Sequence, residues 1–384
     1  MTTFSSGGFH GLAVFTEATF GVSTMATLTS LRHTSCALVL SKETFQSAEL
    51  RSDRQITDFR HGNQKPAGNI GFEFSYEAFD TFLEAALGGT WQAAYSSVSA
   101  AWAAGKTANI IYSSSATHSL ITGDVISVSG FTGTQGLTLN TTLVIGGHVP
   151  HTLTITGTTL VTKAAGATVT LLRNPSLTAG TVYRSFGIER TFGDISKYQQ
   201  FTGCVVNSLN FSVKPNAIVT GEFGMLARGA YSTSTPWDSA PTAAATGSPY
   251  DSFTGAIYEG GSAIGFVTAI DLKLDNGGTP TYVIGDDQTP AITMGRSNLT
   301  GSLDVYFADL GMLRKFEDET ESSVEFYLGT GLPGGTSYRF FLPRVKYGSG
   351  DNPASDEKPI ILKMSYQAVH SSVHNTNIRI TKIA

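Results

Sequence analysis

The sequence has few cysteines, few charges and no long apolar run. Its only two cysteines, Cys36 and Cys204, are too few for a disulfide framework, and each lies in an apolar run that predicts a small buried side chain. No run approaches the ~20 apolar residues of a membrane span. Residues 1–10 lack the basic and apolar regions of a signal peptide. We therefore expect a protein that avoids membranes and that matures in a reducing cytoplasm or is indifferent to redox state.

The few charges of the chain are mainly acidic, which argues against a protein that wraps nucleic acid. Charged residues make up 14% of the 384 residues, against about 25% in ordinary soluble domains. Asp and Glu (30) outnumber Lys and Arg (25), so the net charge is −5 at pH 7. A protein that wraps nucleic acid needs a basic surface, which this composition does not supply. The hydrophobic share of 41% allows a substantial core, and the scarcity of charge suggests that partners cover part of the surface.

Short segments that alternate apolar and polar residues dominate the chain. This period-two pattern predicts half-buried antiparallel strands. The clearest examples are residues 72–76, 209–213, 270–274 and 303–306. Helical spacing is confined to residues 76–87, which Gly88-Gly89 closes, and to residues 308–317. The predicted fold class is mainly β with two short helices.

Residues 92–172 differ from the rest of the chain. Lys106, Asp124 and Lys163 are their only charged residues, and Thr, Ser, Gly and Val are abundant. Several short alternating segments, such as residues 124–128 and 152–156, predict a small all-β module inserted into the chain. A low-complexity linker is the alternative, but the alternation is too regular for one.

Two parts of the chain resemble each other. Residues 69–76 run directly into the first predicted helix, and residues 298–305 run in the same way into the second, at an offset of 229 residues in the strand. A predicted strand precedes each pair and a predicted hairpin follows it. We therefore predict two tandem copies of one β-β-α-β-β unit, each with a short helix. The predicted division is an N-terminal arm at 1–24, a first unit at 25–91 and 173–261, the inserted β-sandwich module at 92–172, and a second unit at 262–384.

The residue patterns of a catalytic or metal site are missing. The eight histidines are scattered and gather no third ligand: His10, His33, His61, His118, His148, His151, His370 and His374. Residues 329–334 match G-x-G-x-x-G, but Pro333 and a following strand favour a hairpin. The acidic residues at 317–321 fit a solvated helix end better than a carboxylate pair for glycoside hydrolysis or a calcium site. We predict no enzyme, cofactor or metal.

Four segments together resemble the tail tube (major tail) proteins of long, non-contractile bacteriophage tails, those of siphophages. They are residues 17–21, residues 47–54 with 58–62, residues 68–91, and residues 342–347 with the strands that follow to 383. The second and third segments are adjacent and in order, and they are the more specific. The resemblance covers nearly the whole chain apart from residues 92–172.

This resemblance implies a β-sandwich or barrel flanked by a helix, with inner sheets that join between subunits around a lumen. The rings stack into a tube through which DNA passes as a transient, non-specific passenger. The implied partners are further copies of the chain, the tape measure protein and the tail terminator and tip proteins. The implied location is the virion tail, after assembly in the host bacterial cytoplasm. Immunoglobulin-like modules often decorate such tubes, which is the expected role of residues 92–172.

The predicted duplication bears on stoichiometry. If each chain supplies two tube units, a ring of six units needs only three chains, so we favour a pseudo-hexameric trimer over a true hexamer. Closing a sheet across subunits removes exposed edges, and stacked heterologous interfaces make a filament. A mildly acidic balance suits a lumen through which DNA slides without sticking.

We expect function to reside in surfaces. The polar loop at residues 47–62 is expected to reach a neighbouring subunit or ring, with an ordinary solvated hairpin as the alternative. Its candidate contact residues are Glu49, Arg51, Asp53, Arg54, Asp58 and Arg60. The candidate lumen-lining residues are Glu73, Glu222, Asp271 and Asp304. A one-residue error in register would turn each of these four into the core. The arm at 1–24 is expected to dock on a neighbour, and residues 317–321 to form an exterior or ring-to-ring acidic patch.

Two other functions fit parts of the sequence. A secreted or surface adhesin, or a carbohydrate-binding β-protein, would explain the Thr- and Gly-rich insert and the lack of catalytic groups. No secretion signal or C-terminal anchor of the kind usual in adhesins is visible. A β-rich glycoside hydrolase would need paired carboxylates in a cleft with aromatic platforms, and the sequence does not bring Trp91, Trp102 and Trp237 together.

Overall fold

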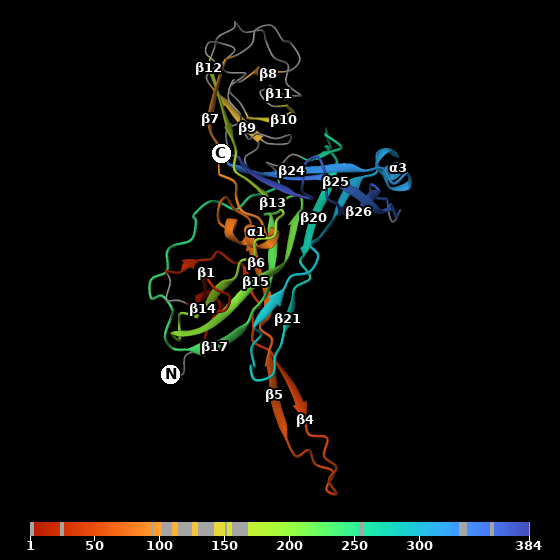
Figure 1. The fold of residues 1–384 in the computed structure, drawn as a ribbon. Helices are drawn as coiled ribbons and strands as arrows, with labels where there is room; N and C mark the ends of the chain where they lie inside the picture. Colours follow the sequence, from red (N-terminus) through yellow and green to blue (C-terminus); the bar gives the residue numbers. More distant parts are fainter. Residues whose placement is uncertain are drawn as a thin grey trace.

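The computed structural model describes residues 4–23, 27–93, 95–101, 110–113, 125–129, 142–149, 152–155, 168–252, 257–329, 336–353 and 357–383. These residues form a 17-stranded sheet, a six-stranded sheet, two two-stranded sheets and two short α-helices (Figure 1). The predicted mainly β fold with two short helices is confirmed. Neither of the described helices is long and apolar enough to cross a membrane.

The chain divides into three runs of elements. The first run, after a short 3-10 turn at Gly7–Phe9, contains β1 (His10–Thr16), β2 (Thr29–Ser30), β3 (Ser35–Cys36), β4 (Lys42–Gln46), β5 (Phe59–Gln64), β6 (Ala67–Glu73), α1 (Asp80–Leu87), β13 (Ser176–Thr178), β14 (Phe186–Phe192), β15 (Lys197–Val213), β16 (Thr220–Leu226) and β17 (Gly229–Thr233). The second run contains β18 (Ile257–Glu259), β19 (Ser262–Ala263), β20 (Val267–Asp275), β21 (Thr279–Thr281), β22 (Ala291–Thr293), β23 (Asn298–Tyr306), α3 (Gly311–Glu317), β24 (Ser322–Gly329), β25 (Ser337–Asp351), β26 (Ile361–Ala368) and β27 (Arg379–Ile383).

The third run interrupts the first between α1 and β13. Its strands are β7 (Tyr95–Ala101), β8 (Ile110–Ser113), β9 (Val125–Ser129), β10 (Thr142–Val149), β11 (Thr152–Ile155) and β12 (Thr168–Arg173). They form a sheet of their own in the order β7-β12-β9-β10-β11-β8. All residues of these strands except Arg173 lie within residues 92–172, where the sequence predicts an insert. Residues 94, 102–109, 114–124, 130–141, 150–151 and 156–167 of the insert lie outside the described part of the chain.

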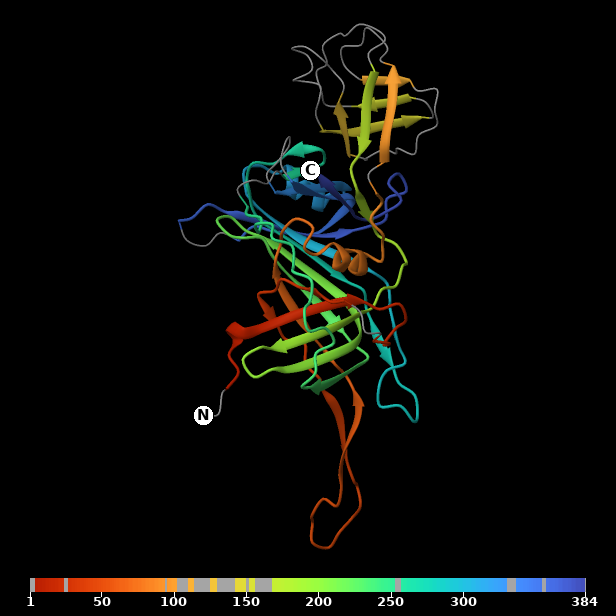
Figure 2. The same cartoon turned by 90° about the vertical axis from the view of Figure 1, so that its left-hand side faces the viewer.

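A continuous run of the large sheet crosses the molecule in the order β3, β6, β16, β15, β20, β23, β26 and β25. The long strands β15 and β25 each bend at a bulge, between Val206 and Ser208 and between Tyr347 and Ser349. Before its bulge, β15 pairs with β14 and β17, and β25 pairs with β24 and β27. These flanking strands form second layers against the long run, and Figure 2 shows β1 lying across it.

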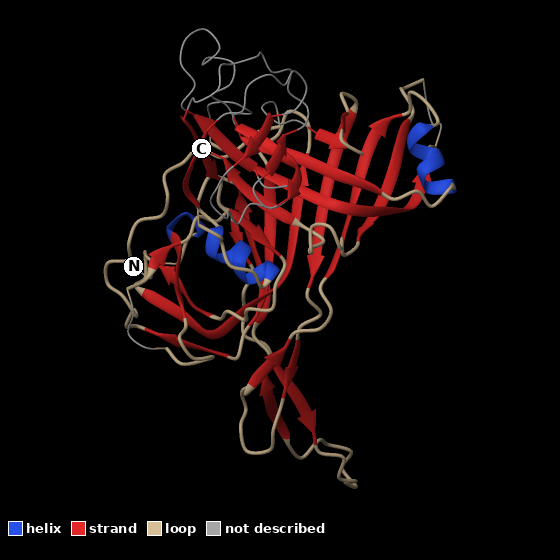
Figure 3. Ribbon diagram, turned by 45° about the horizontal axis from the view of Figure 1, so that its top comes forward, coloured by secondary structure: helices blue, strands red, loops and turns tan. Residues whose placement is uncertain are grey.

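The core lies between the long sheet and its covering layers. Phenylalanine rings dominate it, with ring centroids 4.5 Å apart for Phe72 and Phe223 and 4.8 Å apart for Phe82 and Phe186. All four side chains are almost completely buried. Burial of each of these side chains contributes roughly 1.5–3 kcal/mol to the stability of the fold. Figure 3 shows α1 over the middle of the strands and α3 at the far end of the sheet.

Both helices are shorter than their sequence patterns predict. Glu77 has a positive φ of 57°, so the chain turns there and α1 begins only at Asp80. The predicted stop is confirmed, because Gly88 is left-handed with φ 61° and a Cβ there would lie 2.8 Å from the carbonyl oxygen of Gly180. The helix α3 begins at Gly311, whose N–H binds the Asp309 carboxylate at 2.7 Å.

The two cysteines differ from each other in burial. Cys204 is fully buried as predicted, whereas Cys36 is only half-buried, and both are free thiols. Cys36 is more open than expected because β3 has a paired neighbour, β6, on one side only among the described strands. The apolar run that contains it therefore lies at a sheet edge.

Candidate assembly surfaces

One face of the long sheet is polar, and it carries all four carboxylates predicted to line a lumen. Glu73, Glu222, Asp271 and Asp304 alternate with buried apolar residues on β6, β16, β20 and β23. The alternation predicted their orientation correctly. That this face lines a lumen remains a prediction at this point.

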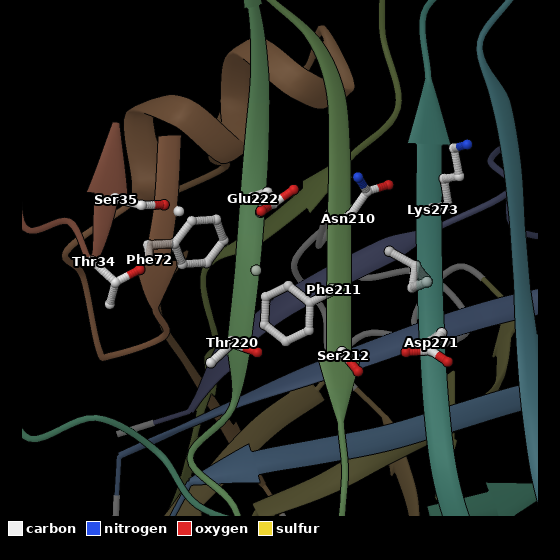
Figure 4. A pocket seen from close by; sticks show the side chains of 13 residues that line it. Thr34, Ser35, Phe72, Asn210, Phe211, Ser212, Thr220, Glu222, Asp271 and Lys273 are labelled. Carbon is white, nitrogen blue, oxygen red and sulfur yellow. The ribbon is translucent and has the colours of Figure 1, made fainter. Parts of the chain in front are cut away.

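Neighbouring strands place these groups in rows. Asn210 stands opposite Glu222 on one side and Lys273 on the other, and Ser212 stands between Thr220 and Asp271. Figure 4 shows these two rows on β16, β15 and β20. They line a shallow groove of about 430 Å³. The groove is lined by amides, hydroxyls and charges of both signs together with Phe72 and Phe211, and it is open rather than an enclosed pocket for one ligand.

The carboxylates are held by weak local contacts. Glu222 accepts a hydrogen bond from Asn69 at 3.2 Å, and Asp271 accepts one from Ser302 at 3.3 Å. Partial burial and the nearby Asp271 raise the pKa of Asp304, while Lys363, directly opposite on β26, acts against this rise. Over β6, β16, β20, β23 and β26 the face carries five carboxylates against two lysines: Glu73, Glu222, Asp271, Asp275 and Asp304 against Lys273 and Lys363.

The predicted contact loop forms a hairpin, β4–β5, that extends well beyond the body of the molecule (Figures 1 and 2). Its charged candidates mostly pair with each other. Arg51 binds Asp53 through two hydrogen bonds of 2.9 and 2.7 Å, Arg60 binds Asp58 at 2.6 Å, and Glu49 accepts a hydrogen bond from Thr57 at 3.3 Å. Exposed pairs two residues apart contribute little stability. The sixth candidate, Arg54, takes a left-handed turn with φ 60°.

Sequence reasoning missed the apolar residues of this hairpin. Four large side chains on it are exposed: Phe45 at 56%, Leu50 at 102%, Ile56 at 63% and Phe59 at 53%. Single exposed apolar residues are ordinary, whereas four on one narrow projection form an unusual exposed apolar group. The signal was present in the sequence as apolar residues at intervals within a polar segment.

The base of the hairpin is anchored, so its direction is defined. The Gln64 amide donates to the Asp287 carboxylate at 2.8 Å, and its backbone N–H donates to the Asp287 carbonyl at 2.7 Å. Tyr282 donates to the Gln64 carbonyl at 3.3 Å. Residues 282–287 belong to the loop between β21 and β22. The end of β5 and this loop, which come from opposite halves of the sequence, therefore hold each other in place.

Residues 10–16 of the predicted arm form part of the body. They make β1, which pairs along its full length with β14 of the same chain. The Glu17 carboxylate then accepts hydrogen bonds from Gly21, Ser185 and Gly203, at 2.8, 2.7 and 2.8 Å. This network explains the motif at residues 17–21. The predicted arm therefore docks within its own chain over these residues.

The remaining sequence candidates have structural roles. The fold brings His10 and His33 together, with ring nitrogens 2.9 Å apart, which the sequence did not predict. Burial and the nearby Arg190 lower the pKa of His10 to about 4. Glu321 of the predicted acidic patch binds Arg344 through hydrogen bonds of 2.7 and 2.5 Å. The Gly-rich segment joins β24 to β25, which pair as a hairpin as predicted, and residues 330–335 lie outside the described part.

Among the described residues, no group of three or more His, Cys, Asp or Glu side chains could hold a metal ion. A polar sheet face, open sheet edges and a projecting hairpin define a structural β-protein that works through surfaces. The chain matches the family model of the phage tail tube protein over residues 10–368. It therefore belongs to the phage tail tube protein family and is a non-enzymatic structural component of the virion tail, where copies of the chain polymerise. A search of curated proteins found no match.

Proposed function

We propose that three copies of this chain close into a ring of six similar units, and that these rings stack into the tail tube of a long, non-contractile-tailed phage. The observation that carries the proposal is a one-to-one correspondence between the strand pairings of the two halves. The polar sheet face would line the lumen, and the β4–β5 hairpin would contact the neighbouring ring.

The correspondence extends to the bulges. The β14–β15 pairing shifts register between Phe186 and Ile188, and the β24–β25 pairing shifts between Ser322 and Val324. Later in the long strands, the shift at Val206–Ser208 matches the shift at Tyr347–Ser349. Bulges are specific local features, so two at matching places support a duplicated unit.

The order of the elements also matches. Strands within the first half pair in the same pattern as strands within the second half. The elements of the first half, in order, are β1, β2, β3, β4–β5, β6, α1, β14, β15, β16 and β17. They correspond one by one to β18, β19, β20, β21–β22, β23, α3, β24, β25, β26 and β27. In this alignment Glu73 corresponds to Tyr306, an offset of 233 rather than 229. We therefore propose units at residues 10–233 and 257–383, with β1 inside the first unit instead of in an arm.

Ring stoichiometry follows from the join between the units. Residues 208–213 of β15 pair with residues 270–275 of β20, so the first unit already sits beside the second as sheet neighbours. A tube of six units then needs three chains, each contributing two. The strands that correspond to β15 and β20, namely β25 and β3, lie at the two ends of the long sheet. A head-to-tail contact between them in neighbouring chains would repeat the internal join, and head-to-tail contacts of this kind build rings.

The charge of the polar face suits a DNA conduit. The five carboxylates of this face outnumber Lys273 and Lys363, so on balance it repels phosphates. The insert at residues 92–172 would lie outside as a decoration, because its sheet is separate from the long sheet. The tape measure protein would occupy the lumen before DNA, and terminator and tip proteins would cap the two ends.

Electron microscopy of the purified protein at high concentration tests this function. Hollow rings or tubes are the expected result, with strong six-fold rotational power from the similar units and added three-fold power from the differences between the two units of each chain. True six-fold symmetry with six chains per ring would reject the trimer. Particles of uniform size without a lumen, even when tail tip components are added, would reject self-assembly into a tube.

A further inference from the structure

The join between β15 and β20 is a sheet interface that the chain makes with itself. Ser208, Asn210 and Ser212 stand opposite Asp275, Lys273 and Asp271. The Asn276 N–H donates to the Asn207 carbonyl at 2.8 Å, just beyond the end of this pairing. Backbone direction alternates along a strand, so the main-chain groups of Leu272 and Leu274 also point to β15.

The strand that corresponds to β20 in the first unit has an open edge. Ala37 and Val39 donate their N–H groups to Asn69 and Ala67 on β6 at 2.8 and 3.1 Å. By the same alternation, the main-chain groups of Leu38 and Leu40 point away from β6. No described strand pairs with them there. Val39 and Leu40 are 51% and 39% exposed, a large apolar exposure for a sheet edge.

The strand that corresponds to β15 in the second unit is open in the same way. Past Val345, β25 pairs with β26 on one edge, and its other edge has no partner among the described strands. Its bulge at residues 347–349 matches the bulge of β15 at residues 206–208. Ser349, Gly350 and Asp351 therefore occupy the places of Ser208, Leu209 and Asn210.

We propose that Ser349–Asn352 of one chain pairs antiparallel with residues 38–41 of the next chain, in the register of the internal β15–β20 join. Copying that register places Ser349 opposite Ser41, Gly350 opposite Leu40, and Asp351 opposite Val39. The partner is a second copy of this chain, and the inference rests on the proposed tube function. Long unpaired edges invite such pairing.

One contact distinguishes the open edge from the internal join. Arg190 on β14 donates to the Leu38 carbonyl at 2.6 Å, whereas the residue that corresponds to Arg190 in the second unit is Phe326. Arg190 fixes the direction of the Leu38 carbonyl, whose second lone pair can still accept a hydrogen bond from the next chain. The edge is therefore already shaped for the next chain, which lowers the ordering cost of association.

Cysteine cross-linking of the assembled protein tests the register. Val39 and Asp351 would form a non-hydrogen-bonded pair, whose Cα atoms lie about 4.5 Å apart, within disulfide reach. The variant is Val39→Cys with Asp351→Cys, in a Cys36→Ser background because Cys36 lies on the same edge. After mild oxidation of rings, we expect most of the protein to run as covalent trimers, with nothing larger, on a non-reducing gel.

Two controls make the result specific. Asn210→Cys with Lys273→Cys places the same pair in the internal join and should close within one chain at any concentration. Val39→Cys with Ser349→Cys is a diagonal pair on the same face, at about 7–8 Å, and should link poorly.

Each outcome has a separate meaning. Rings in which the 39–349 pair links and the 39–351 pair does not would overturn the register while leaving the tube function intact. Covalent hexamers would support the register and reject the ring of three. If the internal pair closes but neither rings nor interchain links form, self-assembly fails, and the proposed function fails with it.

Discussion

The Tyr338 hydroxyl donates a 2.6 Å hydrogen bond to the Asp80 carboxylate, joining β25 to the first turn of α1 across 258 residues of sequence. The same hydroxyl accepts a hydrogen bond from the Glu77 N–H at 3.0 Å, and Lys382 also binds Asp80. Burial raises the pKa of Tyr338 far above its usual range, so this group stays a neutral donor. The second half of the chain thus fixes the start of the first helix.

Replacing Tyr338 with Phe removes this link and keeps the ring. We expect the free energy of unfolding to fall by about 1–3 kcal/mol, because the Asp80 carboxylate loses a buried donor and the Glu77 N–H loses its acceptor. Urea denaturation followed by tryptophan fluorescence measures the change. Tyr306→Phe, on an exposed side chain, is the matched control and should change stability by less than about 0.5 kcal/mol. Equal effects in both variants would contradict a special role for the bond.

The apolar tip of the β4–β5 hairpin should matter for assembly and not for folding. Leu50→Ser with Ile56→Ser changes two exposed side chains, so the free energy of unfolding of the single chain should stay within about 0.5 kcal/mol. Stacked tubes should become short or disappear, while single rings persist, as measured by electron microscopy and sedimentation. Val373→Ser alters another exposed apolar residue away from the hairpin and should leave tubes unchanged. Tubes of normal length in the double variant would show that the hairpin tip does not join rings.

The carboxylates of the polar sheet face should prevent DNA from binding inside the tube. Reversing Glu73, Glu222 and Asp304 to Lys would place cations where phosphates pass, so tubes should retain short duplex DNA at low salt and release it as salt rises. Co-sedimentation with nuclease protection measures DNA held inside the tube. Glu317→Lys, Asp318→Lys and Glu319→Lys make the same change in net charge at the exposed end of α3. DNA bound to those control tubes should be digested by the nuclease. Equal nuclease protection of DNA in both sets of tubes would show that the polar face does not line the lumen.

The free energy of unfolding should decrease at acidic pH, partly because His10 becomes protonated. Its pKa in the folded chain is lowered to about 4 from 6.5, mainly by burial and then by Arg190 and His33. The unfolded chain therefore binds the proton more readily between these values, so stability is full above pH 6.5 and falls as the pH drops towards 4. His10→Asn should flatten this dependence, measured as the urea midpoint between pH 7 and pH 4.5. His61→Asn on the exposed hairpin serves as the control and should keep the wild-type slope.

The open edge can be blocked without breaking internal bonds. Leu40→Pro removes an N–H that points away from β6, so the single chain should fold and rings should not close. Val39→Pro removes the N–H that binds the Ala67 carbonyl and should destabilise the chain itself by about 1 kcal/mol or more. Gel filtration and thermal unfolding separate the two effects. Rings formed by the Leu40→Pro protein would show that this edge is not the interface.

Several features of the fold follow from local sequence alone. The period-two alternation set the faces of Glu73, Glu222, Asp271 and Asp304, because neighbouring side chains of a strand must point to opposite sides. Gly88 ended α1 because its left-handed conformation excludes a Cβ beside Gly180. The mainly β class also followed, since it depends on composition and short-range pattern.

The partners of the strands were decided only by the tertiary structure. Nothing near residues 10–16 indicates that β1 pairs with β14, about half the chain away, so these residues were predicted to be a docking arm. The meeting of His10 with His33 and the brace between Gln64 and Asp287 depend in the same way on distant pairings. Alternation determines which way a side chain points because it is a property of one strand. Which strand lies alongside, and which edge stays open, depends on how the whole chain buries its aromatic core, and that is settled only when all the strands are in place.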